Sequence, residues 1–261
     1  MPEENSPTGT PAATSTAASQ SPPAARQWSF GELIWHRAIR HVYHPRVAPI
    51  ELKFGAKDEL YDIVARTIGD RPITYLEFGV YRGDSMAKMA KRFTDPRSEF
   101  IGFDSFEGLP EDWGAIGAGT FTTSGSLPGI DDPRVRFVRG WFQNTLLPYL
   151  SLRPVTRPTL VHFDADLYSS TLFLMTALWY HVPEYYFIFD EFSGDEVTAM
   201  FDFSRAYPVD FEFFAAVREP NFDYFPAPRQ LFGRLWQVPY DPKAGGPGGT
   251  PATSPVPGKA T

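Results

Sequence analysis

The 261-residue sequence contains no cysteine. This absence excludes disulfide bonds, a thiolate nucleophile and cysteine-ligated zinc. Apolar runs also stay well short of the roughly 20 residues that a membrane-spanning helix needs. The first residues lack the charged and apolar regions of a secretory signal peptide. We therefore expect a cytoplasmic protein with no membrane partner.

Clusters of basic residues are absent as well, and the formal net charge is −7. A nucleic-acid partner is disfavoured, because proteins bind phosphates through grouped lysine and arginine side chains. Aromatic residues, in contrast, make up 16% of the chain. This abundance indicates a bulky core or an aromatic-lined pocket.

The two ends of the chain have almost no large apolar residues. Residues 1–27 and 241–261 consist mainly of proline, alanine, threonine, serine and glycine. Such segments bury too little apolar surface to offset the entropy lost on ordering. We predict disordered tails at both ends and one folded domain over residues 28–240.

Between the tails, short apolar segments alternate with segments of helical spacing. We predict strands at residues 73–77, 99–104, 135–138, 159–164, 185–189, 211–214 and 231–236, and helices starting near residues 29, 57, 84, 141 and 170. Such alternation is typical of a parallel sheet covered on both faces. The expected fold class is α/β, with a mostly parallel, seven-stranded sheet.

Two of the helix starts carry capping signals. Ser29 and Glu32 have the spacing of a capping box. Asp84 or Ser85 would cap the helix that follows the first strand. We therefore expect side-chain caps at both positions.

The first strand leads into a turn with two glycines, Gly79 and Gly83, before a helix begins. A strand, a tight turn and a helix N-terminus are the parts of a nucleotide cradle. A glycine needed only for packing would give the same pattern. Dinucleotide-binding folds use three glycines in this turn, so a nicotinamide-dependent oxidoreductase is the weaker alternative.

Four predicted strands end in an acidic residue: Glu77, Asp104, Asp164 and Asp190. In an open parallel sheet, ligands bind outside the carboxyl ends of the strands. A single carboxylate there is often a cap or a salt-bridge partner. Four in register favour a functional site at this edge of the sheet.

Four motifs occur in the order in which a known enzyme family has them. They are Leu-Glu-Phe-Gly-Val-Tyr-Arg-Gly-Asp-Ser (76–85), Phe-Asp-Ser-Phe-Glu-Gly-Leu-Pro (103–110), Gly-Trp-Phe-Gln-Asn-Thr-Leu (140–146) and His-Phe-Asp-Ala-Asp-Leu-Tyr-Ser-Ser-Thr (162–171). Together they resemble the macrocin-type sugar O-methyltransferases of macrolide biosynthesis, which are class I enzymes dependent on S-adenosylmethionine. The resemblance covers roughly residues 73–192 and implies a Rossmann-like class I methyltransferase fold.

The resemblance also implies which residues contact the cofactor. Glu77 would meet the ammonium group of S-adenosylmethionine, and Gly79 and Gly83 would permit close approach of the backbone. Asp104 would accept hydrogen bonds from the ribose hydroxyls. The other implied contacts are Ser85, Ser105, Gly140 and Trp141, although Trp141 is equally compatible with a core aromatic.

A divalent cation is the second group that the resemblance implies. Asp164, Asp190 and Glu191 are the candidate ligands, since Mg²⁺ prefers oxygen donors and would lower the pKa of an acceptor hydroxyl. Asp166 is a further catalytic candidate, as a ligand, a base or a supporting group. Relatives commonly have paired aspartates where this chain has Asp190 and Glu191, so the effect of Glu191 on metal binding stays open.

The general base is not identified by the sequence. Some relatives use a histidine in the loop after the second strand, but residues 105–133 contain none. The candidates in this loop are carboxylates instead: Glu107, Asp112, Asp131 and Asp132. His162 lies in an apolar strand, which is typical of a buried core histidine.

The predicted function is transfer of a methyl group from S-adenosylmethionine to a hydroxyl of a sugar, polyol or related natural product, with magnesium assistance. The expected partner is a small-molecule acceptor. The sequence leaves open the identity of this acceptor and whether the protein forms a homo-oligomer. The main alternative is a non-catalytic cofactor-binding or scaffold protein with the same fold, because Glu191 and the missing histidine depart from the family pattern.

Overall fold

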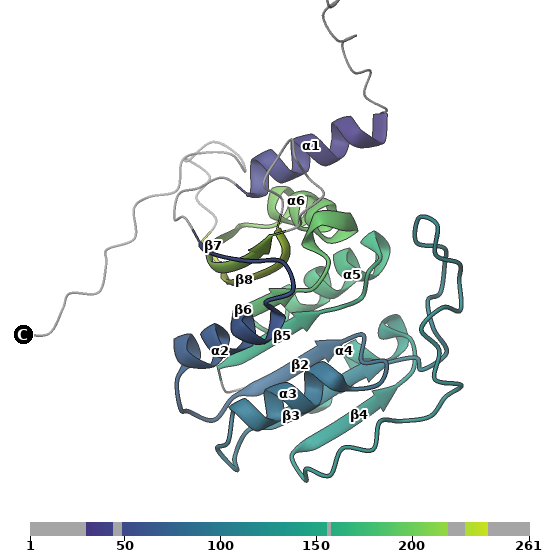
Figure 1. Ribbon diagram of the computed structural model, residues 1–261, viewed down its shortest axis with the longest axis vertical. Helices are drawn as coiled ribbons and strands as arrows, with labels where there is room; N and C mark the ends of the chain where they lie inside the picture. The colour runs from purple at the N-terminus through teal and green to yellow at the C-terminus, as the bar shows by residue number, and fades with distance from the viewer. Residues whose placement is uncertain (1–29, 44–48, 156–157, 219–227, 240–261) are drawn as a thin grey trace, which may run out of the picture.

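The computed structural model describes residues 30–43, 49–155, 158–218 and 228–239 (Figure 1). The predicted disordered tails and the capping residue Ser29 lie outside these residues. Within the described ranges, every helix is too short or too polar to span a bilayer.

One eight-stranded sheet organises the chain, in the order β1-β7-β8-β6-β5-β2-β3-β4. The strands are β1 (Ile50–Leu52), β2 (Thr74–Phe78), β3 (Glu99–Asp104), β4 (Val135–Arg139), β5 (Thr159–Phe163), β6 (Glu184–Phe189), β7 (Val209–Arg218) and β8 (Pro228–Gln237). All pairings are parallel except those of β8, which runs antiparallel to β6 and β7. The predicted α/β class with a mostly parallel sheet is confirmed.

The sheet has one strand more than the seven expected. The additional strand, β1, is three residues long and pairs with β7 at the edge of the sheet. Three residues are too few to show an alternating apolar pattern, so the sequence carried no signal for it.

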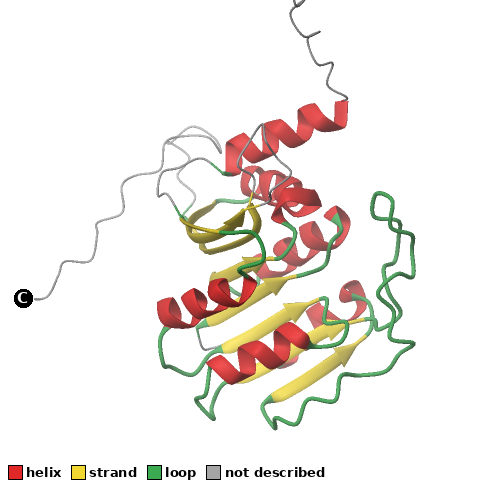
Figure 2. Cartoon of the chain, in the orientation of Figure 1, coloured by secondary structure: helices red, strands yellow, loops and turns green. Residues whose placement is uncertain are grey.

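Helices cover both faces of the sheet (Figures 1 and 2). They are α1 (Phe30–Val42), α2 (Lys57–Ile68), α3 (Asp84–Arg92), α4 (Phe142–Leu152), α5 (Tyr168–Trp179) and α6 (Val197–Ala206), with a π-helical turn at Phe192–Glu196. Apolar residues of α2 and α3 pack with Tyr75 and Leu160, whereas those of α1, α4, α5 and α6 pack with Leu76 and Val161. Successive strand residues thus supply two separate hydrophobic layers, as the pleat of a strand requires.

Helix α3 begins without the side-chain cap that the sequence predicted. Its N-cap is Gly83, at φ 81°, and makes no side-chain hydrogen bond, so capping by Asp84 or Ser85 is wrong. The turn from β2 needs a positive φ at this position, which glycine adopts without steric strain. The Ser85 hydroxyl instead donates to the Glu77 carboxylate.

Candidate active site

A cavity of about 500 Å³ opens at the carboxyl ends of the central strands. The order of the strands reverses between β2 and β5, and ligands of open α/β sheets bind at such a reversal. Eight of the predicted site residues line the cavity: Gly79, Asp104, Ser105, Gly140, Trp141, Asp164, Asp166 and Glu191. The structure therefore gathers most of the predicted site in one place.

The other predicted site residues lie outside the cavity wall. Glu77 is fully buried, and Asp190 is 7% exposed. Gly83 packs against the loop that follows β3, where an added Cβ would lie 2.9 Å from Pro128 Cβ. Ser85 is occupied by its hydrogen bond to Glu77. For these residues, cofactor or metal contact stays a prediction.

Asp104 fixes the turns on which the cavity is built. Its Oδ2 accepts hydrogen bonds from the backbone amides of Val80 and Tyr81, both at 2.8 Å. Its Oδ1 accepts one from the amide of Phe106 at 2.7 Å. The carboxylate thus joins the turn after β2 to the turn after β3, which is a structural role beside the predicted ribose contact.

The long loop between β3 and β4 forms an apolar wall of the cavity. It folds back on itself through hydrogen bonds between Leu109 and Gly119 and between Trp113 and Ile116. Figure 2 shows it reaching beyond the carboxyl ends of the strands. Trp113, Ile116 and Phe121 of this loop line the cavity. These residues were not predicted, because no pattern distinguishes a pocket aromatic within an irregular loop.

Trp141 follows the carboxyl end of β4, where the chain enters α4. It lines the cavity and is 36% exposed. The alternative of a core aromatic is therefore wrong, and Trp141 offers an indole ring to a ligand in the cavity.

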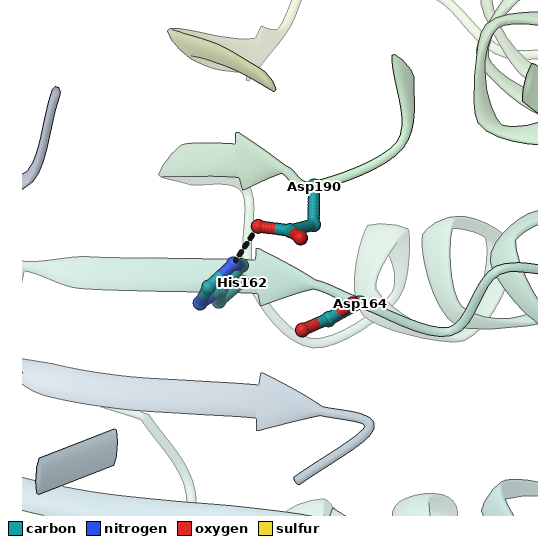
Figure 3. Close-up of side chains that lie close together, drawn as sticks. All are labelled: His162, Asp164 and Asp190. Carbon is teal, nitrogen blue, oxygen red and sulfur yellow. Dashed lines mark ion pairs between the residues drawn. The ribbon is translucent and has the colours of Figure 1, made fainter. Parts of the chain in front are cut away.

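An acidic cluster lies where β5 and β6 end (Figure 3). His162, Asp164 and Asp190 each have a potential metal-ligand atom, and these three atoms lie within 4.8 Å of one another. His162 Nε2 is 3.5 Å from Asp190 Oδ1, and His162 Nδ1 is 2.7 Å from the Tyr75 hydroxyl. His162 is fully buried, as predicted, and burial lowers the pKa of its imidazole. It is nevertheless next to the site and not merely part of the core.

Two cations of the chain itself face this cluster. Lys57 Nζ, at the start of α2, is 2.6 Å from Asp190 Oδ1. Arg229, on β8, donates to the Glu191 carboxylate and lines the cavity. Neither residue was predicted, because ion pairs between residues so far apart in the sequence leave no local signal.

The donor set fits a hard divalent cation in part. Asp164 and Asp190 bring carboxylate oxygens together, and such oxygens are the preferred ligands of Mg²⁺. Burial, and then the charge of Asp190, raises the pKa of Asp164 well above its usual range. Glu191, the third predicted ligand, forms an ion pair with Arg229, and its role as a ligand stays a prediction.

Asp166 is the cavity carboxylate with the properties of a base. It lies in the turn after β5 at φ 60°, a backbone conformation that is strained for aspartate. Burial, and then the charge of Glu191, raises the pKa of Asp166 to about 7. The four carboxylates named as candidates in the loop after β3 do not line the cavity. Among the candidates that the sequence left open, Asp166 is therefore the best placed.

Glu77 makes stability depend on pH. Burial raises the pKa of its carboxyl from 4.5 to about 8. Between these values the folded chain holds a proton that the unfolded chain has released, so the free energy of unfolding falls as the pH rises from about 4.5 to about 8. We expect Glu77→Gln to reduce this fall by a few kcal/mol in urea unfolding at several pH values. An unchanged slope would contradict the buried, protonated carboxyl.

Comparison with known proteins gives a family match and several distant structural likenesses. The sequence profile of the Macrocin-O-methyltransferase (TylF) family matches residues 57–210. An 8-demethyl-8-(2,3-dimethoxy-alpha-L-rhamnosyl)-tetracenomycin-C 4'-O-methyltransferase of Streptomyces olivaceus is 26% identical over 193 residues, which are 63% of this chain and 71% of that protein. Among solved structures, the calicheamicin methyltransferase CalS11 has a TM-score of 0.49 at 18% identity, covering 84% of this chain and 98% of its own. The O-methyltransferase NovP has a TM-score of 0.47 at 20% identity, covering 69% and 79%.

Proposed function

This chain belongs to the macrocin O-methyltransferase family, and we propose that it transfers the methyl group of S-adenosylmethionine to a hydroxyl of a sugar, polyol or related natural product. We assign this activity to one domain over residues 28–240. The observation that carries the proposal is the position of Asp166 in the wall of the same cavity as the turns that Asp104 fixes. Base and cofactor cradle thus face one space.

The cofactor side of the cavity is the part built from the ends of β2, β3 and β4. Gly79, Asp104, Ser105, Gly140 and Trp141 line it. S-adenosylmethionine has no pyrophosphate, so a turn with two glycines suffices where a dinucleotide would need a third. This argument, and the family membership, favour S-adenosylmethionine over a nicotinamide cofactor.

The reaction needs a base, because a sugar hydroxyl is far too weak an acid to ionise at neutral pH. S-adenosylmethionine, when bound, supplies an electrophilic methyl group on its sulfonium. The transfer would need no further co-reactant, since the sulfur would keep the electron pair of its bond to the methyl carbon. Asp166 takes the proton of the hydroxyl as a general base, a role for which a pKa of about 7 is suited.

Metal assistance is the second part of the proposal. Asp164 and Asp190 would hold a magnesium ion beside the acceptor, where the ion would lower the pKa of the acceptor hydroxyl. The oxygen donors of these two residues support this assignment. Glu191 is paired with Arg229, and its contact with the ion stays a prediction.

A sugar ring is the acceptor group that the cavity fits best. The relative from Streptomyces olivaceus is named for methylating a rhamnosyl group. In the present cavity, Trp113 and Phe121 provide apolar ring faces, and Asp166, Glu191 and Arg229 provide polar groups. Ring faces suit the C–H face of a sugar, and the polar groups suit its hydroxyls.

The cofactor assignment is tested by calorimetry with S-adenosylhomocysteine. Because Asp104→Ala frees three backbone amides that shape the cavity, we expect the variant to bind at least tenfold more weakly. Asp95→Ala is the matched control, since its Oδ1 also accepts a backbone amide, that of Arg97 at 2.8 Å, in the turn before β3, and Asp95 does not line the cavity. No binding by the unaltered protein, or equal affinity in Asp104→Ala, would refute the assignment. Turnover of glycosylated acceptors separates the enzyme from a non-catalytic scaffold.

A further inference from the structure

Two of the three carboxylates that the family pattern assigns to a cation already face a cation of this chain. Lys57 is paired with Asp190, and Arg229 with Glu191. These two cations offset part of the negative charge of the three carboxylates. A divalent ion is attracted by this cluster far less than by three unpaired carboxylates.

The Lys57 pair is the more direct obstacle to an ion. Its ammonium lies 2.6 Å from Asp190 Oδ1, the same oxygen that faces His162 Nε2 at 3.5 Å. The Lys57 side chain is 33% exposed and that of Asp190 is 10% exposed. Water screens charges poorly in such a place, so the ammonium and a divalent ion next to Asp190 repel each other strongly.

We propose that Lys57 is the resident counter-ion of Asp190 and sets the affinity of the site for a divalent cation, which binds only in competition with the Lys57 ammonium. The proposal rests on the assignment of Asp164 and Asp190 to a cation in the proposed function. Lys57 is a positioning residue in this view: it holds the Asp190 carboxylate in place and limits its access to metal. Other negative groups that face Lys57 are Asp164 and Glu77, and both remain when Lys57 is replaced.

Manganese binding measures this competition without any turnover. The free Mn²⁺ signal in electron paramagnetic resonance gives the dissociation constant for the unaltered protein, Lys57→Met and Lys57→Gln. We expect both variants to bind Mn²⁺ at least tenfold more tightly. Lys57→Gln keeps a hydrogen-bond donor for Asp190, so it carries the test if Lys57→Met does not fold. In Lys57→Gln combined with Asp190→Asn, the gain should disappear.

Lys88→Met is the matched control for the loss of one positive charge. Lys88 lies on α3, pairs with Asp58 of α2 at 3.1 Å and is 42% exposed. Its removal takes the same charge from the same face of the sheet but leaves the Asp190 pair intact. We expect the affinity of Lys88→Met for Mn²⁺ to stay within about twofold of the unaltered protein, because exposed charges are screened.

Calorimetry with S-adenosylhomocysteine on the same preparations separates the possible failures. If the variants bind this ligand and yet bind Mn²⁺ no more tightly than the unaltered protein, the role of Lys57 is refuted and the methyltransferase proposal stands. An equal gain in Lys88→Met would also refute it, since the effect would then be one of overall charge. If the unaltered protein does not bind S-adenosylhomocysteine, the proposed function fails, whatever the Mn²⁺ result.

Discussion

Replacing Asp166 by asparagine should lower kcat for methyl transfer by about 10²–10⁴-fold, the usual contribution of a general base. The amide is close in shape to the carboxylate but cannot accept the acceptor proton at neutral pH. Asp166 lines the cavity but is not one of the residues assigned to the cofactor. The affinity for S-adenosylhomocysteine should therefore change less than about threefold. Steady-state kinetics and calorimetry on one preparation give both quantities.

The pH dependence of the unaltered enzyme is a second readout of the same residue. The base works as a carboxylate, and burial raises the pKa of Asp166 to about 7. We therefore expect kcat to fall about tenfold per pH unit below about pH 7, and Asp166→Asn to lack this limb. Asp202→Asn is the control: Asp202 accepts a hydrogen bond from the Tyr168 hydroxyl at 2.8 Å and does not line the cavity. A kcat within a few-fold of the unaltered value in Asp166→Asn would exclude Asp166 as the base.

The predictable part of the fold is the part with strong apolar periodicity. Helix α2 begins at Lys57, as predicted, because apolar side chains at helical spacing follow this residue. The strands β2, β3, β5 and β6 were found because each is nearly all apolar, as buried parallel strands are. The N-cap of α3 was missed because a required positive φ at Gly83 took precedence over capping propensity.

The site was predictable where an acidic residue ends a strand or follows it directly. Asp104 is the last residue of β3, and Asp164 and Asp190 come directly after β5 and β6. Glu77 is still within β2, opposite His162 of β5, and its side chain is buried. Phe78 pairs with Phe103 and with Phe163, so Glu77 lies two residues before the level of Asp104 and Asp164, within the paired part of the sheet. The sequence does not resolve the end of a strand that finely, so it placed Glu77 with the others.

The two cations of the site show the other limit of the sequence. For Lys57, the sequence predicted only that a helix starts there. Arg229 lies in β8, but the sequence predicted this strand to start at Leu231. Their partners, Asp190 and Glu191, were both predicted as candidate metal ligands. Ion pairs of this kind arise from the packing of α2 and β8 against the end of β6. They determine the charge of the site and are visible only in three dimensions.

Gly79→Ala should destabilise the protein more than any other single change considered, by more than about 4 kcal/mol in the free energy of unfolding. A Cβ at Gly79 would lie 1.8 Å from the backbone oxygen of Asp164 and 2.7 Å from its carbonyl carbon. Neither side can yield easily, because Asp164 N donates to Phe78 O at 2.9 Å and Gly79 N donates to Phe103 O at 3.0 Å. Relief of this overlap must separate β2 from β5, where the cavity lies.

Gly55→Ala separates this overlap from the backbone strain that any alanine meets at positive φ. Gly55 has φ 82°, close to the 90° of Gly79, but an added Cβ there meets nothing within 4 Å. Its substitution should cost only about 1–2 kcal/mol in urea unfolding, the strain of a left-handed conformation alone. Because the overlap in Gly79→Ala also displaces Asp164, that variant should lose methyl transfer even under conditions where it folds, whereas Gly55→Ala should keep it. Equal losses of stability in the two variants would mean that Gly79 is needed only for its φ angle. The close contact between the backbones that follow β2 and β5 would then not limit the residue at this position.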